Sequence, residues 1–159
     1  MHKNILFVLI ALSLVIGSQA GCKKKSDLVP EPRPAAQINL TRVPSPANAK
    51  VFFQGLKNGD EVSQNLMVKF GAEGIAVEPA GEVKEGSGHF HLLIDVETLP
   101  PLDQPIPFTD QMLHFGQAQT TATIHLEPGT HTLQILLAAG NHVPHDPAIM
   151  SEKIKIVVK

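Results

Sequence analysis

The sequence predicts an all-β domain in which about seven short antiparallel strands form a sandwich with two long loops. Three observations indicate this class. Apolar and polar residues alternate over short segments, as expected for strands with one buried face. Turn signals such as Asn58-Gly59-Asp60 and Glu127-Pro128-Gly129 separate these segments. No helical period extends over three turns between residues 49 and 159.

The chain begins with a predicted export signal over residues 1–21. A basic start precedes an apolar run from Ile5 to Ile16, and small residues follow it. The apolar run is too short for a permanent membrane span. Ala20-Gly21-Cys22 resembles the bacterial lipobox, so we expect Cys22 to be lipidated; ordinary cleavage after Ala20 is the alternative. Cys22 is the only cysteine, which excludes an intrachain disulfide and a thiolate zinc site.

Residues 22–48 are interpreted as the lipidated cysteine followed by a linker. Lys23-Lys24-Lys25 would favour anionic headgroups, and repeated prolines favour an extended spacer. We therefore expect an exported protein, anchored by lipid on the periplasmic face of a bacterial outer membrane. The formal net charge is −2 and the chain has no Trp or Tyr. Nucleic acid is excluded as a partner because its binding needs a basic, aromatic groove.

Residues 49–159 form the predicted domain. Two irregular segments, Glu97–Gln119 and Asn141–Met150, are the predicted long loops. The strands, in order, are Lys50–Gln54, Leu66–Phe70, Ile75–Glu78, Gly86–Val96, Thr120–Leu126, Thr130–Ala138 and Lys153–Lys159.

The segment from Leu126 to Leu133 predicts a particular kind of sandwich. A turn at Glu127-Pro128-Gly129 leads into an apolar strand, as at the corner between two strands of immunoglobulin-like and fibronectin-like domains. A polar side chain ties such a corner back to the backbone, and His131 is the candidate here. We therefore expect an immunoglobulin- or fibronectin-like arrangement.

Four longer segments resemble an uncharacterised bacterial family, domain of unknown function 4399 (DUF4399). They are GHFHLLIDV (88–96), LPPLDQPIPFTDQMLHFGQAQT (99–120), LEPGTHTLQILLAAGNHVPHDP (126–147) and MSEKIKI (150–156). The resemblance implies an exported or anchored bacterial protein with a β-sandwich and brings no established activity. It also implies that many relatives have histidine at the position of Phe90. This chain would then lack one imidazole ring of a histidine cluster that those relatives have.

Histidines are the candidate functional residues. His89 and His91 are two positions apart on a strand, so both rings can reach one ligand. Imidazole is a good ligand for copper and zinc. Asp95 or Asp146 would then orient a ligating ring. The predicted metal ligands are His89, His91, His114, His142 and His145.

These observations predict a membrane-anchored, non-enzymatic binding domain for a copper or zinc ion. The alternative is a structural module of the cell envelope, in which the histidines brace the loops and a surface binds an envelope protein. A carboxylate-dependent hydrolase is a third hypothesis. It is disfavoured because no spacing fixes two carboxylates at a working separation and no aromatic platform for a sugar is present.

Overall fold

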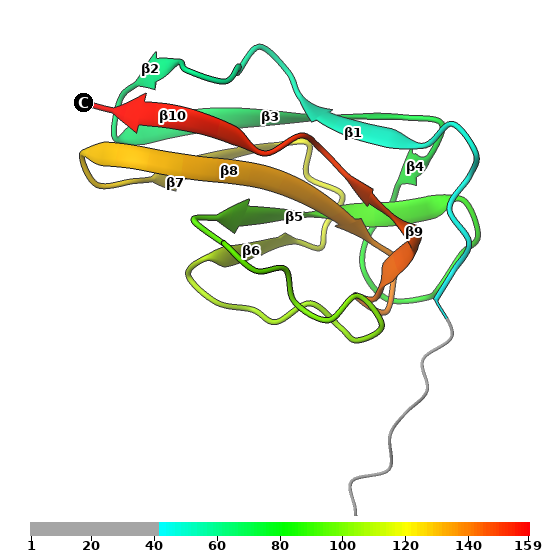
Figure 1. The fold of residues 1–159 in the computed structure, drawn as a ribbon. Coiled ribbons are helices and arrows are strands. Elements are labelled where there is room, and N and C mark those ends of the chain that lie inside the picture. The colour runs from blue at the N-terminus through cyan, green and yellow to red at the C-terminus, as the bar shows by residue number, and fades with distance from the viewer. Residues whose placement is uncertain (1–41) are drawn as a thin grey trace, which may run out of the picture. The chain divides into compact units, whose positions relative to one another are not determined.

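Residues 42–159 of the protein are described by a computed structural model. They form two packed β-sheets (Figure 1), which confirms the all-β sandwich. The described residues contain no helix, and so none long and apolar enough to cross a membrane. The predicted signal and lipidation at Cys22 lie outside these residues.

The smaller sheet has the strand order β1-β3-β7, and the larger sheet has the order β2-β10-β8-β5-β4, with β6 paired to β5 and β9 paired to β8. The strands are β1 (Lys50–Phe53), β2 (Glu61–Val62), β3 (Asn65–Glu73), β4 (Ala76–Val77), β5 (Ser87–Ile94), β6 (Met112–Phe115), β7 (Thr121–His125), β8 (Gly129–Ala138), β9 (Pro144–Met150) and β10 (Ile154–Val158).

All seven predicted strands are present, and the structure corrects the rest of the prediction. Both predicted loops contain a strand, β6 in the first and β9 in the second, and the two-residue strand β2 lies between the first two predicted strands. Pro144 and Pro147 obscured β9, because proline lacks a backbone donor and is tolerated in a strand only at an edge or bulge. The sheets are also not purely antiparallel, because β2 pairs with β10 and β4 pairs with β5 in parallel.

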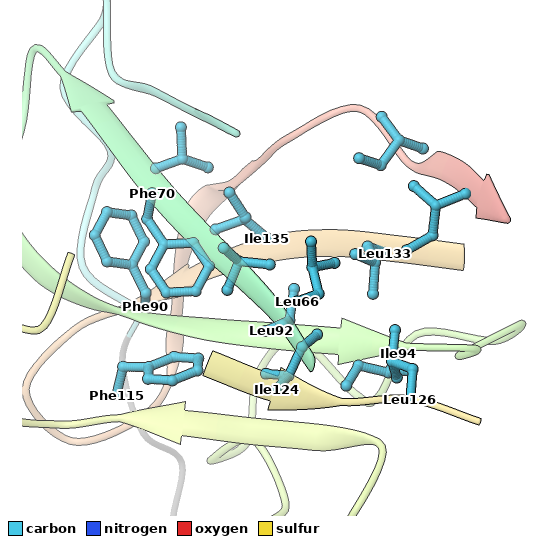
Figure 2. Close-up of a cluster of buried hydrophobic side chains, with 14 of the residues drawn as sticks. Leu66, Phe70, Phe90, Leu92, Ile94, Phe115, Ile124, Leu126, Leu133 and Ile135 are labelled. Carbon is cyan, nitrogen blue, oxygen red and sulfur yellow. The ribbon is translucent and has the colours of Figure 1, made fainter. Parts of the chain in front are cut away.

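The core lies between the two sheets and follows the predicted alternation. Phe90, Leu92 and Ile94 of β5 face the same layer as Leu133 and Ile135 of β8. Figure 2 shows side chains of β3 meeting them from the other sheet. At one end of this layer the ring of Phe70 lies 5.1 Å from Phe90 and 4.9 Å from Phe115, measured between centroids. These aromatic contacts join strand β3 of the smaller sheet to β5 and β6 of the larger one.

Strand β5 is buried on both faces, which the alternation alone did not predict. Its second face continues from His89 and His91 to Leu93, which belongs to a separate apolar cluster with Val96, Ile106, Leu136 and Ala138. Ile106 comes from the segment between β5 and β6, so this segment folds over the outer face of the larger sheet. The histidines therefore lie beneath a loop and are not on an open sheet surface.

Residues 42–48, which the sequence assigned to the linker, begin the described structure and run along β9. The amide of Ser45 donates to the carbonyl of Asp146 at 3.0 Å, and the amide of Asp146 donates to the carbonyl of Val43 at 2.9 Å. The side chain of Arg42 donates to the carbonyl of Pro144 at 3.1 Å and pairs with the Asp146 carboxylate at 3.0 Å. Figure 1 shows the described chain beginning on the β9 side of the sandwich.

Candidate metal centre

His89 and His91 lie on the outer face of β5, opposite the core. Both are fully buried, with 0 % of each residue exposed. The i, i+2 spacing places the rings side by side, and their Nε2 atoms are 3.1 Å apart. Phe90 between them points into the core and is also 0 % exposed. The inference that Phe90 replaces a ring of the cluster is therefore wrong, because a side chain at position 90 faces the other way.

His114 reaches the pair through the register of two strands. Strand β6 runs antiparallel to β5 and places His114 directly opposite His91. Residues opposite one another in such a ladder have side chains on the same face and in contact. The ring of His114 folds over Gly116, where an added Cβ would lie 2.2 Å from Cε1 of the ring. A glycine at this position thus leaves the space that the imidazole occupies.

His142 enters from the tight turn between β8 and β9. Its amide donates to the carbonyl of Ala139 at 2.8 Å, and the amide of Ala139 donates to the carbonyl of Val143 at 3.0 Å. The turn places His142 at φ 68°, a left-handed conformation that histidine adopts more readily than most residues. Its own carbonyl accepts from the amide of Ile106 at 3.0 Å, which ties the turn to the loop over β5.

Four imidazoles therefore converge from three separate segments of the chain. All six centroid distances among His89, His91, His114 and His142 lie between 4.8 Å (His114 to His142) and 6.0 Å (His91 to His142). Candidate ligand atoms of His89, His114 and His142 are all within 4.8 Å of one another. These three residues form a group that could hold a metal ion. We call the four residues the histidine cluster.

The surroundings keep the buried rings of the histidine cluster neutral. Burial, and then the neighbouring rings of His142 and His114, lower the pKa of His89 to about 4. Burial and the rings of His89 and His114 lower the pKa of His91 to about 2. The pKa of His114 is lowered by burial and by His142. A neutral imidazole has a free lone pair, which is the form that binds metal.

Several ring nitrogens of the histidine cluster have no hydrogen-bond partner among the described residues. These buried atoms are Nδ1 of His89, Nδ1 of His91 and Nε2 of His114. The contact between the Nε2 atoms of His89 and His91 needs one nitrogen to donate and the other to accept. The accepting ring must then carry its proton on the unpartnered Nδ1. Buried polar groups usually find partners, so these nitrogens are exceptions within the described residues.

His145, also predicted as a ligand, is not in the group of described residues that could hold a metal, although its ring helps to lower the pKa of His89. It is fully buried, and its Nε2 donates to the carbonyl of Ser87 at 3.1 Å, where it can only act as the donor. Burial, as the largest effect, lowers its pKa. His145 is the second residue of β9, and its side chain braces the start of β5. The structure thus brings together His89, His91, His114 and His142 and leaves His145 outside.

The acidic residues predicted to orient a ligating ring serve other contacts. Asp95 follows the last residue of β5 at φ 54° and turns away to accept from Nδ1 of His131 at 2.6 Å. Asp146 pairs with Arg42. Within residues 42–159 no carboxylate joins the group that could hold a metal. A hydrolase built on converging carboxylates therefore gains no support from the described structure.

His131 is the corner residue that the sequence predicted. Its Nε2 donates to the carbonyl of Glu127 at 2.9 Å while Nδ1 donates to Asp95. Both partners are acceptors, so both nitrogens must carry protons and the ring is an imidazolium. The hydrogen bond to Asp95 is the main cause that raises the pKa of His131. For Asp95, burial acts to raise the pKa, but hydrogen bonds from Thr132 and His131 outweigh it and lower the pKa.

Phe108 is a member of the site that sequence reasoning missed. It lies in the loop between β5 and β6, and its ring centroid is 4.7 Å from that of His114 and 5.2 Å from that of His142. Of the whole residue 62 % is exposed. The available signal was a lone aromatic residue after Pro105 and Pro107 in a polar loop.

Comparison with known protein families identifies a match over much of the domain. A family model described as "Domain of unknown function (DUF4399)" matches residues 68–159. The matched region includes β5, β6, the turn between β8 and β9 and hence all four residues of the histidine cluster. No curated protein and no solved structure matches the chain.

Proposed function

Because the chain belongs to the DUF4399 family, whose description names no activity, we propose from its own site that it is a binding domain for one copper or zinc ion. The ligands are drawn from the histidine cluster, without His145. In this proposal the domain acts outside the cytoplasm and is held at the membrane by a lipid on Cys22. The proposal assigns no catalysis to the site.

The convergence of the four rings carries this proposal. Three atoms within 4.8 Å of one another lie within about 2.8 Å (4.8/√3) of a common point. Zinc and copper bind imidazole nitrogen at about 2.0 Å, so a shift of under 1 Å per ring completes three bonds. Neighbouring nitrogens of a tetrahedral site with such bonds lie about 3.3 Å apart. The fourth ring, that of His91, lies beside this group, with its Nε2 3.1 Å from Nε2 of His89.

The chemistry of the ligands favours particular ions. Imidazole is a ligand of intermediate softness that suits Cu²⁺ and Zn²⁺, whereas Mg²⁺ and Ca²⁺ need oxygen ligands. For a set of nitrogen ligands the affinity for Cu²⁺ exceeds that for Zn²⁺. We therefore expect one equivalent of either ion to bind, with copper the tighter.

Calorimetric titration of metal-free protein with Cu²⁺ and with Zn²⁺ tests the proposal. His114→Ala removes one ring, and His142→Asn removes another while keeping a residue that tolerates positive φ. Each variant is expected to weaken binding by at least about tenfold. His125→Ala is the matched control, because its ring lies on β7 and bonds to Asn65. No binding by the wild type tighter than about 100 µM would overturn the proposal.

A structural role for the histidine cluster is the second candidate function. One observation favours it: the rings pack on one another and join β5, β6 and the turn before β9, as a brace for the loops would. In that case His114→Ala lowers the free energy of unfolding of the metal-free protein, and added metal leaves it unchanged. Binding of metal would instead stabilise the wild type by an amount that rises with the logarithm of the ion concentration above the Kd.

A further inference from the structure

Phe108 differs from the other strongly exposed apolar residues by what lies beneath it. Phe108 and Met67 are equally exposed, at 62 % each. Besides its contacts with His114 and His142, the ring of Phe108 lies nearly parallel to that of His91, at 10°, with the centroids 6.2 Å apart. One face of the Phe108 ring thus covers the histidine cluster while the other meets solvent.

The protein holds Phe108 in this position from both sides. On one side, Ile106 is buried in the second apolar cluster and its amide donates to the carbonyl of His142. On the other side, Thr109 and Met112 exchange two backbone hydrogen bonds, of 3.4 and 3.1 Å, that close a tight turn. Pro107 restricts the backbone immediately before Phe108. An aromatic ring fixed by such anchors keeps a defined place over the imidazoles.

Burial within the site increases in layers from Phe108 inward. Phe108 is exposed, His114 and His142 are half-buried, and His89 and His91 are fully buried. On this side an ion that reaches the inner pair passes the outer two rings and the Phe108 ring that lies on them. Phe108 therefore lies over the half-buried side of the histidine cluster.

We propose that Phe108 is a cap that must swing aside for a metal ion to enter or leave the histidine cluster. The proposal rests on the metal-binding function above and adds how the same site is regulated: the cap sets the rates of uptake and release. A cap of this kind slows both rates together and leaves the equilibrium affinity nearly unchanged. A residue that only strengthened binding would change the release rate alone.

Rates measured on protein loaded with Cu²⁺ test the cap. Release is followed after adding excess chelator, and uptake by stopped-flow mixing with buffered Cu²⁺. Phe108→Ala is expected to speed both by about tenfold, because the closest ring contacts no longer have to break. Phe108→Leu keeps an apolar side chain, and its uptake and release rates are expected to lie between those of the wild type and those of Phe108→Ala. Met67→Ala, equally exposed but on β3, is the matched control and should leave both rates unchanged.

A second measurement separates the cap from metal binding itself. Diethyl pyrocarbonate modifies neutral imidazole, and mass spectrometry locates the modified residue in metal-free protein. Phe108→Ala is expected to speed modification of His114 and His142 severalfold, with His125 as the internal reference. Wild-type protein that binds no Cu²⁺ while this acceleration is seen would overturn the metal function and support Phe108 only as a cover that shields the histidine cluster from reagents in solution. Unchanged release and unchanged modification in Phe108→Ala would overturn the cap, as would faster release with unchanged uptake.

Discussion

Acid should destabilise the metal-free protein through His91, and replacing His91 should remove a calculable part of that effect. In the folded protein burial lowers the pKa of His91 to about 2 from its ordinary 6.5. Below pH 6.5 the unfolded chain takes up a proton at this residue and the folded chain does not. Above pH 6.5 the ring is therefore neutral in both states and does not reduce the free energy of unfolding. As the pH falls below 6.5, protonation of the unfolded chain lowers that free energy.

The magnitude follows from the size of this window. Between pH 6.5 and about pH 4.5 the folded ring stays neutral, so each pH unit costs about 1.36 kcal/mol. Two units give about 2.7 kcal/mol from this residue alone, which is a large share of the stability of a small domain. His91→Leu places an apolar side chain on the same face of β5 as Leu93. It should remove the part of the pH dependence of the free energy of unfolding that His91 causes.

Urea unfolding at several pH values, with chelator present, measures the effect. Circular dichroism is the suitable probe because the chain has no Trp or Tyr for fluorescence. Leu93→Val is the matched control on the same face of β5: it should lower stability by about 1 kcal/mol at every pH without changing the slope. The reasoning is refuted if His91→Leu keeps the wild-type slope, or if wild-type stability rises on acidification from pH 6.5.

Three further changes have expected outcomes. His131→Leu should lower the free energy of unfolding by about 1.5–3 kcal/mol near neutral pH, since it loses a charged hydrogen bond to Asp95. Because the pKa of His131 is raised in the folded protein, this difference from the wild type should shrink as the pH rises through that folded pKa. Urea unfolding at several pH values above 7 measures the change. Gly116→Ala should push the ring of His114 aside and weaken Cu²⁺ binding in calorimetry about tenfold with little loss of stability; an unchanged affinity would contradict the packing of that ring on the glycine. Phe70→Ala should cost about 3–5 kcal/mol in urea unfolding because the side chain is 1 % exposed between two other rings, and a loss under 1 kcal/mol would argue against that core.

The sequence predicted much of the fold because strand alternation is a local property. All seven predicted strands appear, and the core face of β5 is as expected. The two strands that were taken for loops carried weak local signals. Strand β6 has only four residues, and β9 contains two prolines. Both are recognised only when a neighbouring strand supplies their hydrogen bonds.

The sequence predicted that the site is made of histidines, but it did not predict correctly which residues belong to it. The i, i+2 spacing placed His89 and His91 together. His142 and His145 are three residues apart, and their sequence does not say which one turns toward the pair. His142 lies in the left-handed turn before β9, whereas His145 is the second residue of that strand. Asp95 is not part of the site because it follows β5 and has a positive φ, which turns it away from the histidines. Phe108 is part of the site because the loop that carries it is anchored by hydrogen bonds of its neighbours.

The stretch from residue 86 to residue 96 thus carried, by itself, the two faces of a strand and a pair of imidazoles on one of them. Covalent geometry alone sets that alternation, so no distant contact was needed to infer it. The tertiary structure decided that the face is buried, that β6 aligns His114 with His91, and that the turn before β9 brings His142 over His89. Those outcomes depend on strand register and loop anchoring between residues far apart in the chain, which a local pattern does not determine.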